Sequence, residues 1–131
     1  MSFLSADGYR RYYQDASTEL TVTASTGDTV LITVRSSSHT IFVQRIIGYI
    51  TTDAAQSMAF EDTATTPVKI FEITTSPGDE TRWDCDYGDE GLPLTAGKDF
   101  NMNVSAAGLA GSVKVYAYQK LTAAVAAGST N

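Results

Sequence analysis

The chain has 131 residues and a formal net charge of −6 at pH 7; 43% of its residues are hydrophobic and 18% are charged. This length and composition predict one globular domain rather than a disordered chain. The acidic balance argues against nucleic acid as a partner, because binding phosphates requires a dense positive surface. No apolar run reaches the roughly 18 residues that a membrane span needs, and the single cysteine excludes a disulfide within the chain.

Residues 1–18 are rich in aromatic rings and precede the regular strand pattern, and we expect them to form an extended N-terminal arm. Tyrosine and arginine are enriched at the centres of protein interfaces. Two arrangements fit this segment: it docks on a neighbouring subunit, or it folds back as a satellite of its own core. The predicted partner-binding residues are Phe3, Tyr9, Arg10, Arg11, Tyr12 and Tyr13.

Apolar and polar residues alternate at every second position in residues 20–24 and 29–34, which predicts two half-buried strands. Both segments are rich in β-branched residues, which suit a pleated sheet. The sequence Ser-Thr-Gly-Asp at 25–28 predicts a hairpin turn between them. In the second strand Val30 and Ile32 are expected on one face and Leu31 on the other.

Residues 41–50 form the most apolar segment of the chain. Its Val, Ile and Phe content favours a strand over a buried helix. Both faces are apolar, so the strand is expected either at the centre of the fold or under a neighbouring subunit. Strict alternation assigns Ile41, Val43, Ile47 and Tyr49 to one face and Phe42, Ile46 and Ile50 to the other.

Further strands are predicted at 58–61, 68–74, 81–87, 100–104 and 113–118, with a Pro-Gly turn at 76–79 and a glycine-rich loop at 88–97. The total of about eight strands predicts an all-β, two-sheet antiparallel sandwich of jelly-roll type; an immunoglobulin-like sandwich is the alternative. The sandwich domain is expected to span residues 19–121, followed by a flexible tail at 122–131. The residues expected to face inward in the last two strands are Phe100, Met102, Val104, Val113, Val115 and Ala117, with Asp99, Asn101, Asn103, Lys114, Tyr116 and Tyr118 outside.

The acidic segment 83–91 is the densest candidate for chemistry. Carboxylates suit Ca²⁺, but the segment departs from the EF-hand pattern because Asp89 stands where that loop needs glycine. On a strand, Asp84 and Asp86 would share a solvated face opposite Trp83. We expect an acidic rim rather than a metal site, and no cofactor.

No catalytic motif is present in the sequence. His39 is predicted to be an exposed turn residue, and Cys85, flanked by two aspartates, is predicted to be a small core residue rather than a nucleophile. We therefore expect no enzymatic activity. Tyr116 and Tyr118 share one face of the final strand, and with Trp83 as a third ring this arrangement suits a glycan platform, a subunit interface or cross-strand pairing.

The stretch from Gly91 to Gly108, with its Leu-Thr-Ala-Gly-Lys loop and Ser-Ala-Ala-Gly turn, and the strand from Gly111 to Lys120 resemble the C-terminal half of small virion proteins of tailed bacteriophages. The resemblance covers about 30 residues closely and is a pattern of turns and strands. It implies a jelly-roll capsid decoration (cement) protein, synthesised in the host cytoplasm and located on the outer surface of the head. The implied partners are the major capsid protein and further copies of the chain in a homotrimer. Alternatives are a tail or neck component, or a β-sandwich module that binds glycans or a host surface.

Overall fold

The computed structural model describes residues 16–22, 27–52, 55–105 and 109–121. The predicted tail and residues 1–15 of the predicted arm, including all six predicted partner-binding residues, lie outside this part of the chain. The described residues form strands, turns and loops, and no helix among them is long and apolar enough to cross a membrane. The first strand begins at Ala16, within the range expected for the arm, and the last strand ends at Leu121.

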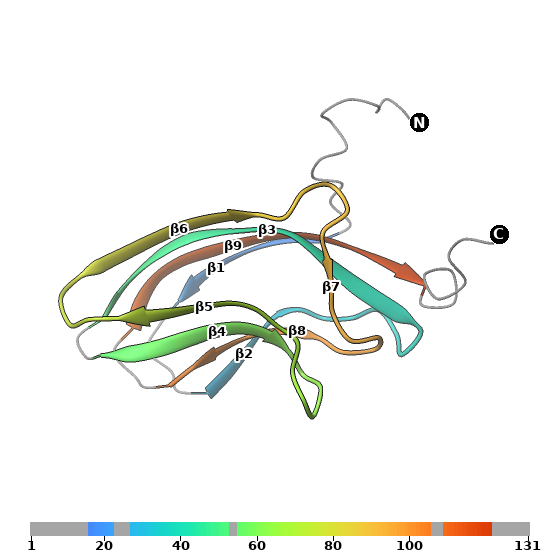
Figure 1. The fold of residues 1–131 in the computed structure, drawn as a ribbon, viewed down its shortest axis with the longest axis horizontal. Coiled ribbons are helices and arrows are strands. Elements are labelled where there is room, and N and C mark those ends of the chain that lie inside the picture. Colours follow the sequence, from blue (N-terminus) through green and yellow to red (C-terminus); the bar gives the residue numbers. More distant parts are fainter. Residues whose placement is uncertain (1–15, 23–26, 53–54, 106–108, 122–131) are drawn as a thin grey trace.

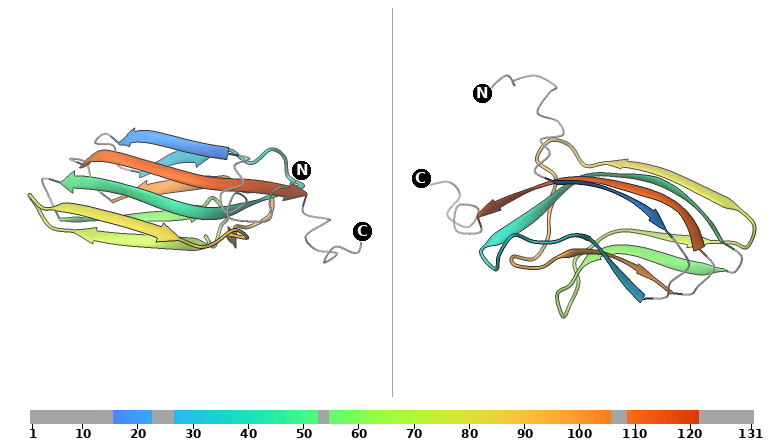
Figure 2. Two further views of the ribbon diagram at one scale, coloured as in Figure 1. Left: turned by 90° about the horizontal axis from the view of Figure 1, so that it is seen from above. Right: turned by 180° about the vertical axis from the view of Figure 1, so that it is seen from behind.

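The described strands form two antiparallel sheets packed face to face (Figures 1 and 2). One sheet has the order β1-β9-β3-β6, with the short β7 paired to β3, and the other has the order β2-β8-β4-β5. The strands are β1 (Ala16–Val22), β2 (Gly27–Ile32), β3 (His39–Thr52), β4 (Gln56–Asp62), β5 (Lys69–Thr75), β6 (Glu80–Asp86), β7 (Leu92–Pro93), β8 (Phe100–Val104) and β9 (Leu109–Leu121).

This strand order is that of a jelly roll. When the two-residue β7 is set aside, the eight longer strands run 1-8-3-6 in one sheet and 2-7-4-5 in the other. The chain therefore crosses between sheets at every connection except β4–β5, which is the pattern of two interlocked Greek keys. The predicted two-sheet sandwich of jelly-roll type is confirmed, and the immunoglobulin-like order is excluded.

The hairpin predicted at residues 25–28 is wrong. β1 pairs with β9 and β2 pairs with β8, so these consecutive strands belong to different sheets. Residues 23–26 lie outside the described part. Turn-forming residues between two alternating segments do not distinguish a hairpin from a crossover, because both connections reverse the chain.

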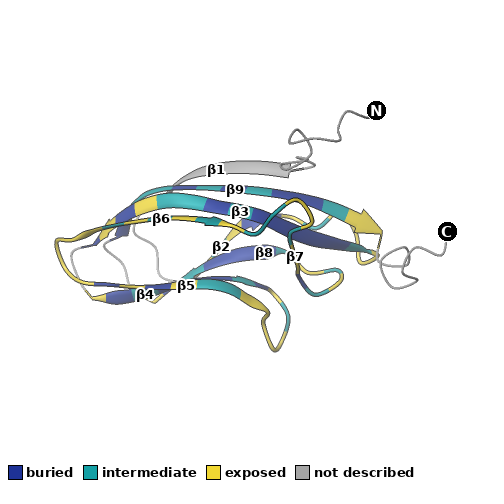
Figure 3. Cartoon of the chain, turned by 45° about the horizontal axis from the view of Figure 1, so that its top comes forward, coloured by how far each residue is buried: buried dark blue, intermediate teal, exposed yellow. Residues whose placement is uncertain are grey.

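The core lies between the inner faces of the two sheets and is made of side chains from nearly every strand (Figure 3). Full burial of such a side chain contributes about 1.5–3 kcal/mol. The residues predicted to face inward in the last two strands are all buried. Asn101, predicted outside, is only 4% exposed, although it lies opposite Val30 and Glu61 on the outer side of its sheet. The largest fully buried side chains are those of Phe60, Phe100, Ile41, Ile46, Ile50, Met58, Met102 and Leu109.

Two register shifts change the predicted faces. In β2 the pairing with β8 shifts between Val30 and Ile32, so Val30 is 49% exposed whereas Ile32 is 4% exposed. In β3 the pairing with β9 shifts between Val43 and Arg45. A bulge of this kind adds one residue to a strand and reverses the alternation beyond it. The prediction of a single alternation along each of these two strands is therefore wrong.

The bulge in β3 places Ile41, Val43, Ile46 and Ile50 together in the core. Ile47 and Tyr49, predicted to share the face of Ile41, instead lie on the outer face of the sheet opposite Lys114 and Ser112. The expectation that this segment is a central strand is confirmed, because β3 lies between β9 and β6. The extra residue, Gln44, is itself fully buried, and its Nε2 donates to the carbonyl oxygen of Asp89 at 2.7 Å.

The loop between β6 and β8 is fixed to β3 by its backbone. The N–H of Leu94 donates to the carbonyl of Ile41 at 2.9 Å, and the N–H of Gly97 donates to that of His39 at 2.8 Å. Gly97 has a φ of +75°, and a Cβ at this position would lie 3.0 Å from the carbonyl oxygen of Ser37. The positive φ therefore favours glycine here, and a Cβ would be tightly placed against the backbone of Ser37.

Candidate interaction surface

The outer face of the β1-β9-β3-β6 sheet brings together charged, aromatic and aliphatic side chains. Its register places them in rows across the strands. Tyr49 of β3 lies between Arg82 of β6 and Ser112 of β9 in one row. The next rows hold Asp84, Ile47 and Lys114, and then Asp86, Arg45 and Tyr116.

An open groove of about 580 Å³ runs over this face. Its floor includes Ile47 and Gly48 of β3, and its sides are formed by β6 and β9. We refer to it as the outer groove. The residues that line it are Ile47, Gly48, Tyr49, Arg82, Trp83, Asp84, Ser112, Lys114 and Tyr116.

Two cations of the outer groove lie over tyrosine rings. The guanidinium carbon of Arg82 is 5.2 Å from the centroid of the Tyr49 ring, and the Nζ of Lys114 is 5.1 Å from that of Tyr116. Arg82 also pairs with Glu80. Such cation–π contacts contribute about 0.5–1 kcal/mol at exposed sites. Tyr49 remains 40% exposed despite its contact with Arg82.

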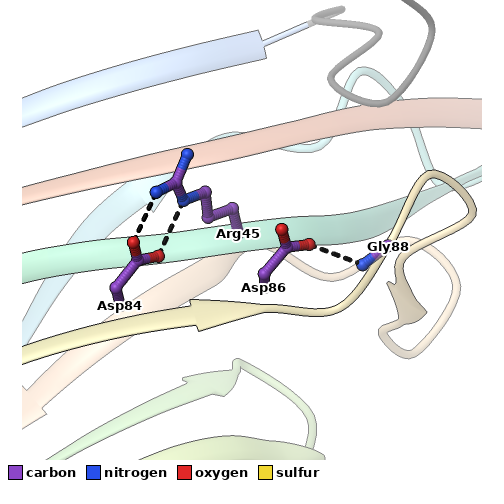
Figure 4. A network of polar contacts seen from close by, with 4 residues as sticks. All are labelled: Arg45, Asp84, Asp86 and Gly88. Carbon is purple, nitrogen blue, oxygen red and sulfur yellow. Dashed lines mark hydrogen bonds and ion pairs between the residues drawn. The ribbon is translucent and has the colours of Figure 1, made fainter. Parts of the chain in front are cut away.

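The acidic strand β6 is occupied by protein contacts (Figure 4). Arg45 of β3 binds Asp84 with both arms of its guanidinium: Nε donates to Oδ1 at 2.7 Å, and Nη2 pairs with Oδ2. This hydrogen-bonded pair lowers the pKa of Asp84 below its ordinary value. The Oδ1 of Asp86 accepts the N–H of Gly88 at 2.9 Å.

These contacts bear on the calcium hypothesis. Asp84 and Asp86 use their oxygens for Arg45 and for the turn at Gly88 rather than pointing together at one centre. In the part of the chain that the structure describes, no three His, Cys, Asp or Glu side chains are grouped so that they could hold a metal ion.

The three rings considered as a glycan platform are not assembled on one surface. Tyr118 is only 7% exposed, because its ring stacks on Phe42 with centroids 5.1 Å apart. Its hydroxyl donates to the carbonyl oxygen of Glu90 at 2.6 Å, and burial raises its pKa. Trp83 packs against Phe60 toward the core, with a centroid distance of 5.9 Å. Of these three rings, Tyr116 and Trp83 line the outer groove and Tyr118 does not.

His39 and Cys85 differ from their predicted settings. His39 begins β3 and is half-buried, and its Nδ1 lies 2.8 Å from the Oγ of Ser36. This is a local contact that closes the turn before the strand. Cys85 is half-buried rather than enclosed in the core. Burial and the neighbouring Cys85 thiol raise the pKa of Tyr87.

Strict alternation of residues does not identify Arg45, Ile47 or Tyr49 as residues of this surface. Ile47 and Tyr49 were assigned to the face of Ile41 because the bulge at residue 44 has no strong signal in the sequence. One signal was present: a charged residue, Arg45, interrupts an apolar segment and marks an outward position. Counting outward positions from Arg45 would have placed Ile47 and Tyr49 correctly.

No family model matches this chain, and no curated protein matches it. Solved structures that align with this chain include one of the disulfide-linked pili of Bacillus endospore appendages, with a TM-score of 0.40 and 12% identity over 79% of this chain and 82% of that one. The coat protein of Tobacco streak virus has a TM-score of 0.36 and 11% identity over 78% and 87% of the two chains. The VP2 subviral particle of infectious bursal disease virus has a TM-score of 0.25 and 8% identity over 90% and 36%. TM-scores below 0.5 at these identities define neither a family nor a function for this chain.

Proposed function

We propose that this chain is a structural protein of a tailed-phage virion. In this proposal it is a head decoration protein without enzymatic activity that binds the outside of the capsid as a homotrimer and stabilises it. The observation that carries the proposal is the jelly-roll strand order, which is common in viral capsid proteins. The two segments that resemble small virion proteins of tailed phages, residues 91–108 and 111–120, contain β8 with the loop before it and most of β9.

The residues that carry this resemblance make structural contacts within the fold. Leu94 is 5% exposed within the core, Gly97 has a positive φ that favours glycine, and the N–H of Thr95 donates to Asp62 at 2.8 Å. A resemblance to other proteins at residues that pack the core or form turns indicates a similar fold rather than a similar active site. The proposal accordingly transfers no catalytic or cofactor-binding residue to this chain.

The chemistry of the surface agrees with binding to protein. The outer groove combines tyrosine, arginine and isoleucine on a rigid sheet, and aromatic residues and arginine are enriched in protein interfaces. A net charge of −6 suits an outer surface better than one that faces packaged DNA. A protein that binds the assembled shell, but not its dissociated subunits, stabilises the shell by mass action.

The test is co-sedimentation with emptied, expanded heads of the phage whose genome encodes this chain. We expect saturable binding to intact heads and a rise in the temperature at which the shell dissociates. A chain that lacks residues 1–13 should lose binding while keeping all described strands, since β1 begins at Ala16. Absence of binding by the full chain would overturn the proposal, and full binding by the truncated chain would overturn the part assigned to the arm.

A further inference from the structure

We propose that the outer groove is a binding site for an uncharged oligosaccharide. This binding is additional to the attachment proposed above and does not depend on a capsid. Three properties of the groove carry it: its size, its rings and the balance of its charges.

The size of the outer groove suits a small ligand. Its volume is about 580 Å³, and binding pockets for small molecules generally measure about 300–1,000 Å³. The groove lies open on the face of a sheet, with β3 at its floor and β6 and β9 at its sides. An open groove can hold part of a longer chain, whereas an enclosed cavity holds a whole small molecule. A segment of an oligosaccharide is a ligand of this kind.

Three aromatic rings line the outer groove, one from each of its strands. They belong to Tyr49 in β3, Trp83 in β6 and Tyr116 in β9, so Tyr49 takes the place that the sequence assigned to Tyr118. Tyr49 lies opposite Ser112, four residues before Tyr116, which separates the two tyrosines by about 14 Å along the sheet. The C–H groups of a sugar ring can pack on an aromatic face while the tyrosine hydroxyl forms a hydrogen bond. A short oligosaccharide would therefore reach from one tyrosine to the other.

The charges of the outer groove balance one another. Arg45 pairs with Asp84 (Figure 4), and Arg82 pairs with Glu80. A ligand with a net charge would therefore gain little attraction from this surface. Within β3, β6 and β9, the rows of the groove and the adjoining Glu80 contain three cations and three carboxylates, those of Arg45, Arg82, Lys114, Glu80, Asp84 and Asp86.

Sugar hydroxyls match the polar groups that lie between the rings. A hydroxyl both donates and accepts, so it can bind the carboxylate of Asp84 as well as the cations of Arg82 and Lys114. Hydrogen bonds to ionised groups are about twice as strong as those between neutral groups. A protein segment is the other class of occupant. The lining favours the sugar, because Ile47 is its one aliphatic side chain and the centres of protein interfaces are depleted of charged residues.

The proposal is tested with a printed array of neutral and anionic oligosaccharides, probed with the full chain in the absence of capsids. We expect binding to neutral members of the array. The neutral oligosaccharide that binds most strongly is then titrated into the protein. The fluorescence of Trp83, the single tryptophan, should change saturably because this residue lines the groove. Since the ligand carries no charge, its affinity should stay nearly constant between about 50 mM and about 500 mM NaCl.

Substitutions test whether the ligand occupies the outer groove. Tyr49→Ala and Tyr116→Ala should each weaken binding about tenfold, whereas Tyr49→Phe, which keeps the ring, should retain most of the affinity. Thr74→Ala is the matched control, because Thr74 is exposed on β5 in the other sheet and its loss should leave binding unchanged. Thermal unfolding of each variant shows that it is folded.

An array without a neutral ligand, an affinity that falls steeply with salt, or an affinity unchanged in both alanine variants would overturn the proposal. An empty array together with loss of capsid binding by Tyr49→Ala would assign the groove to a protein partner instead. Because the array contains no capsids, its result is separate from that of co-sedimentation.

Discussion

The carboxylate of Asp62 joins two loops at one end of the sandwich. The residue is 2% exposed; its Oδ1 accepts the N–H groups of Ala64 and Val68, both at 3.1 Å, and its Oδ2 accepts that of Thr95 at 2.8 Å. Burial alone raises the pKa of Asp62, but the hydrogen bonds from Thr95, Ala64 and Val68 outweigh it and lower the pKa below its ordinary value. The folded state therefore favours the charged carboxylate.

Replacement of Asp62 by Asn tests this role. The amide keeps the volume but turns a donor toward the N–H of Thr95, so we expect a loss of about 1–3 kcal/mol in the free energy of unfolding at pH 7. Because the folded-state pKa is lowered, the stabilisation from Asp62 is present above the unfolded pKa of about 4 and is lost as the pH falls through the folded pKa. Urea unfolding at pH 7 and pH 3 should show the gap between the two proteins narrowing at the lower pH. Equal stability at pH 7, or a gap that widens in acid, would contradict this account.

At the scale of elements, three strands meet at Gly48. A Cβ at this position would lie 2.4 Å from the carbonyl oxygen of Ser112 in β9 and 2.9 Å from Cζ2 of Trp83 in β6. Glycine lets the indole of its cross-strand neighbour Trp83 lie over β3 and reach Phe60 in the opposite sheet. This contact closes the sandwich beside the edge strand β6.

The substitution Gly48→Ala should therefore destabilise the fold by about 1–3 kcal/mol through overpacking. Trp83 is the single tryptophan, so its fluorescence emission should also shift in the folded state. Gly78→Ala is the matched control: its Cβ meets nothing within 4 Å, and it carries only the conformational cost of a positive φ. Thermal unfolding followed by fluorescence reports both effects. An unchanged spectrum and stability for Gly48→Ala would show that the indole does not depend on this glycine.

The elements also show what sequence patterns can predict. The strands β8 and β9 were predicted with their inward faces, because strict alternation persists along them. β2 and β3 were predicted as strands but with incorrect faces, because each contains a bulge. The extra residue is apolar in β2 and polar in β3, and neither is accompanied by turn-forming residues that would reveal the bulge in the sequence. The outer groove depends on one of these bulges. Strict alternation of residues could therefore not predict the outer groove, although it placed Tyr116 and Lys114 on the correct face of the sheet.

For the whole molecule, composition and turn spacing were sufficient to predict two sheets but not their pairing. The crossover between β1 and β2 was read as a hairpin, since local sequence does not report which distant strand supplies the hydrogen bonds. The arm is the other element that a single chain does not explain. Its rings have no assigned partner in the sequence, because a partner on another chain leaves no pattern in this one.

The central claim is that this jelly roll is attached to the outside of a phage head. Its most direct test is electron cryomicroscopy of emptied heads incubated with the protein, compared with heads alone. We predict added density on the outer surface at symmetry-related positions, with three jelly rolls in each feature. Density on the tail or neck, density inside the shell, or maps that are identical with and without the protein would contradict the claim.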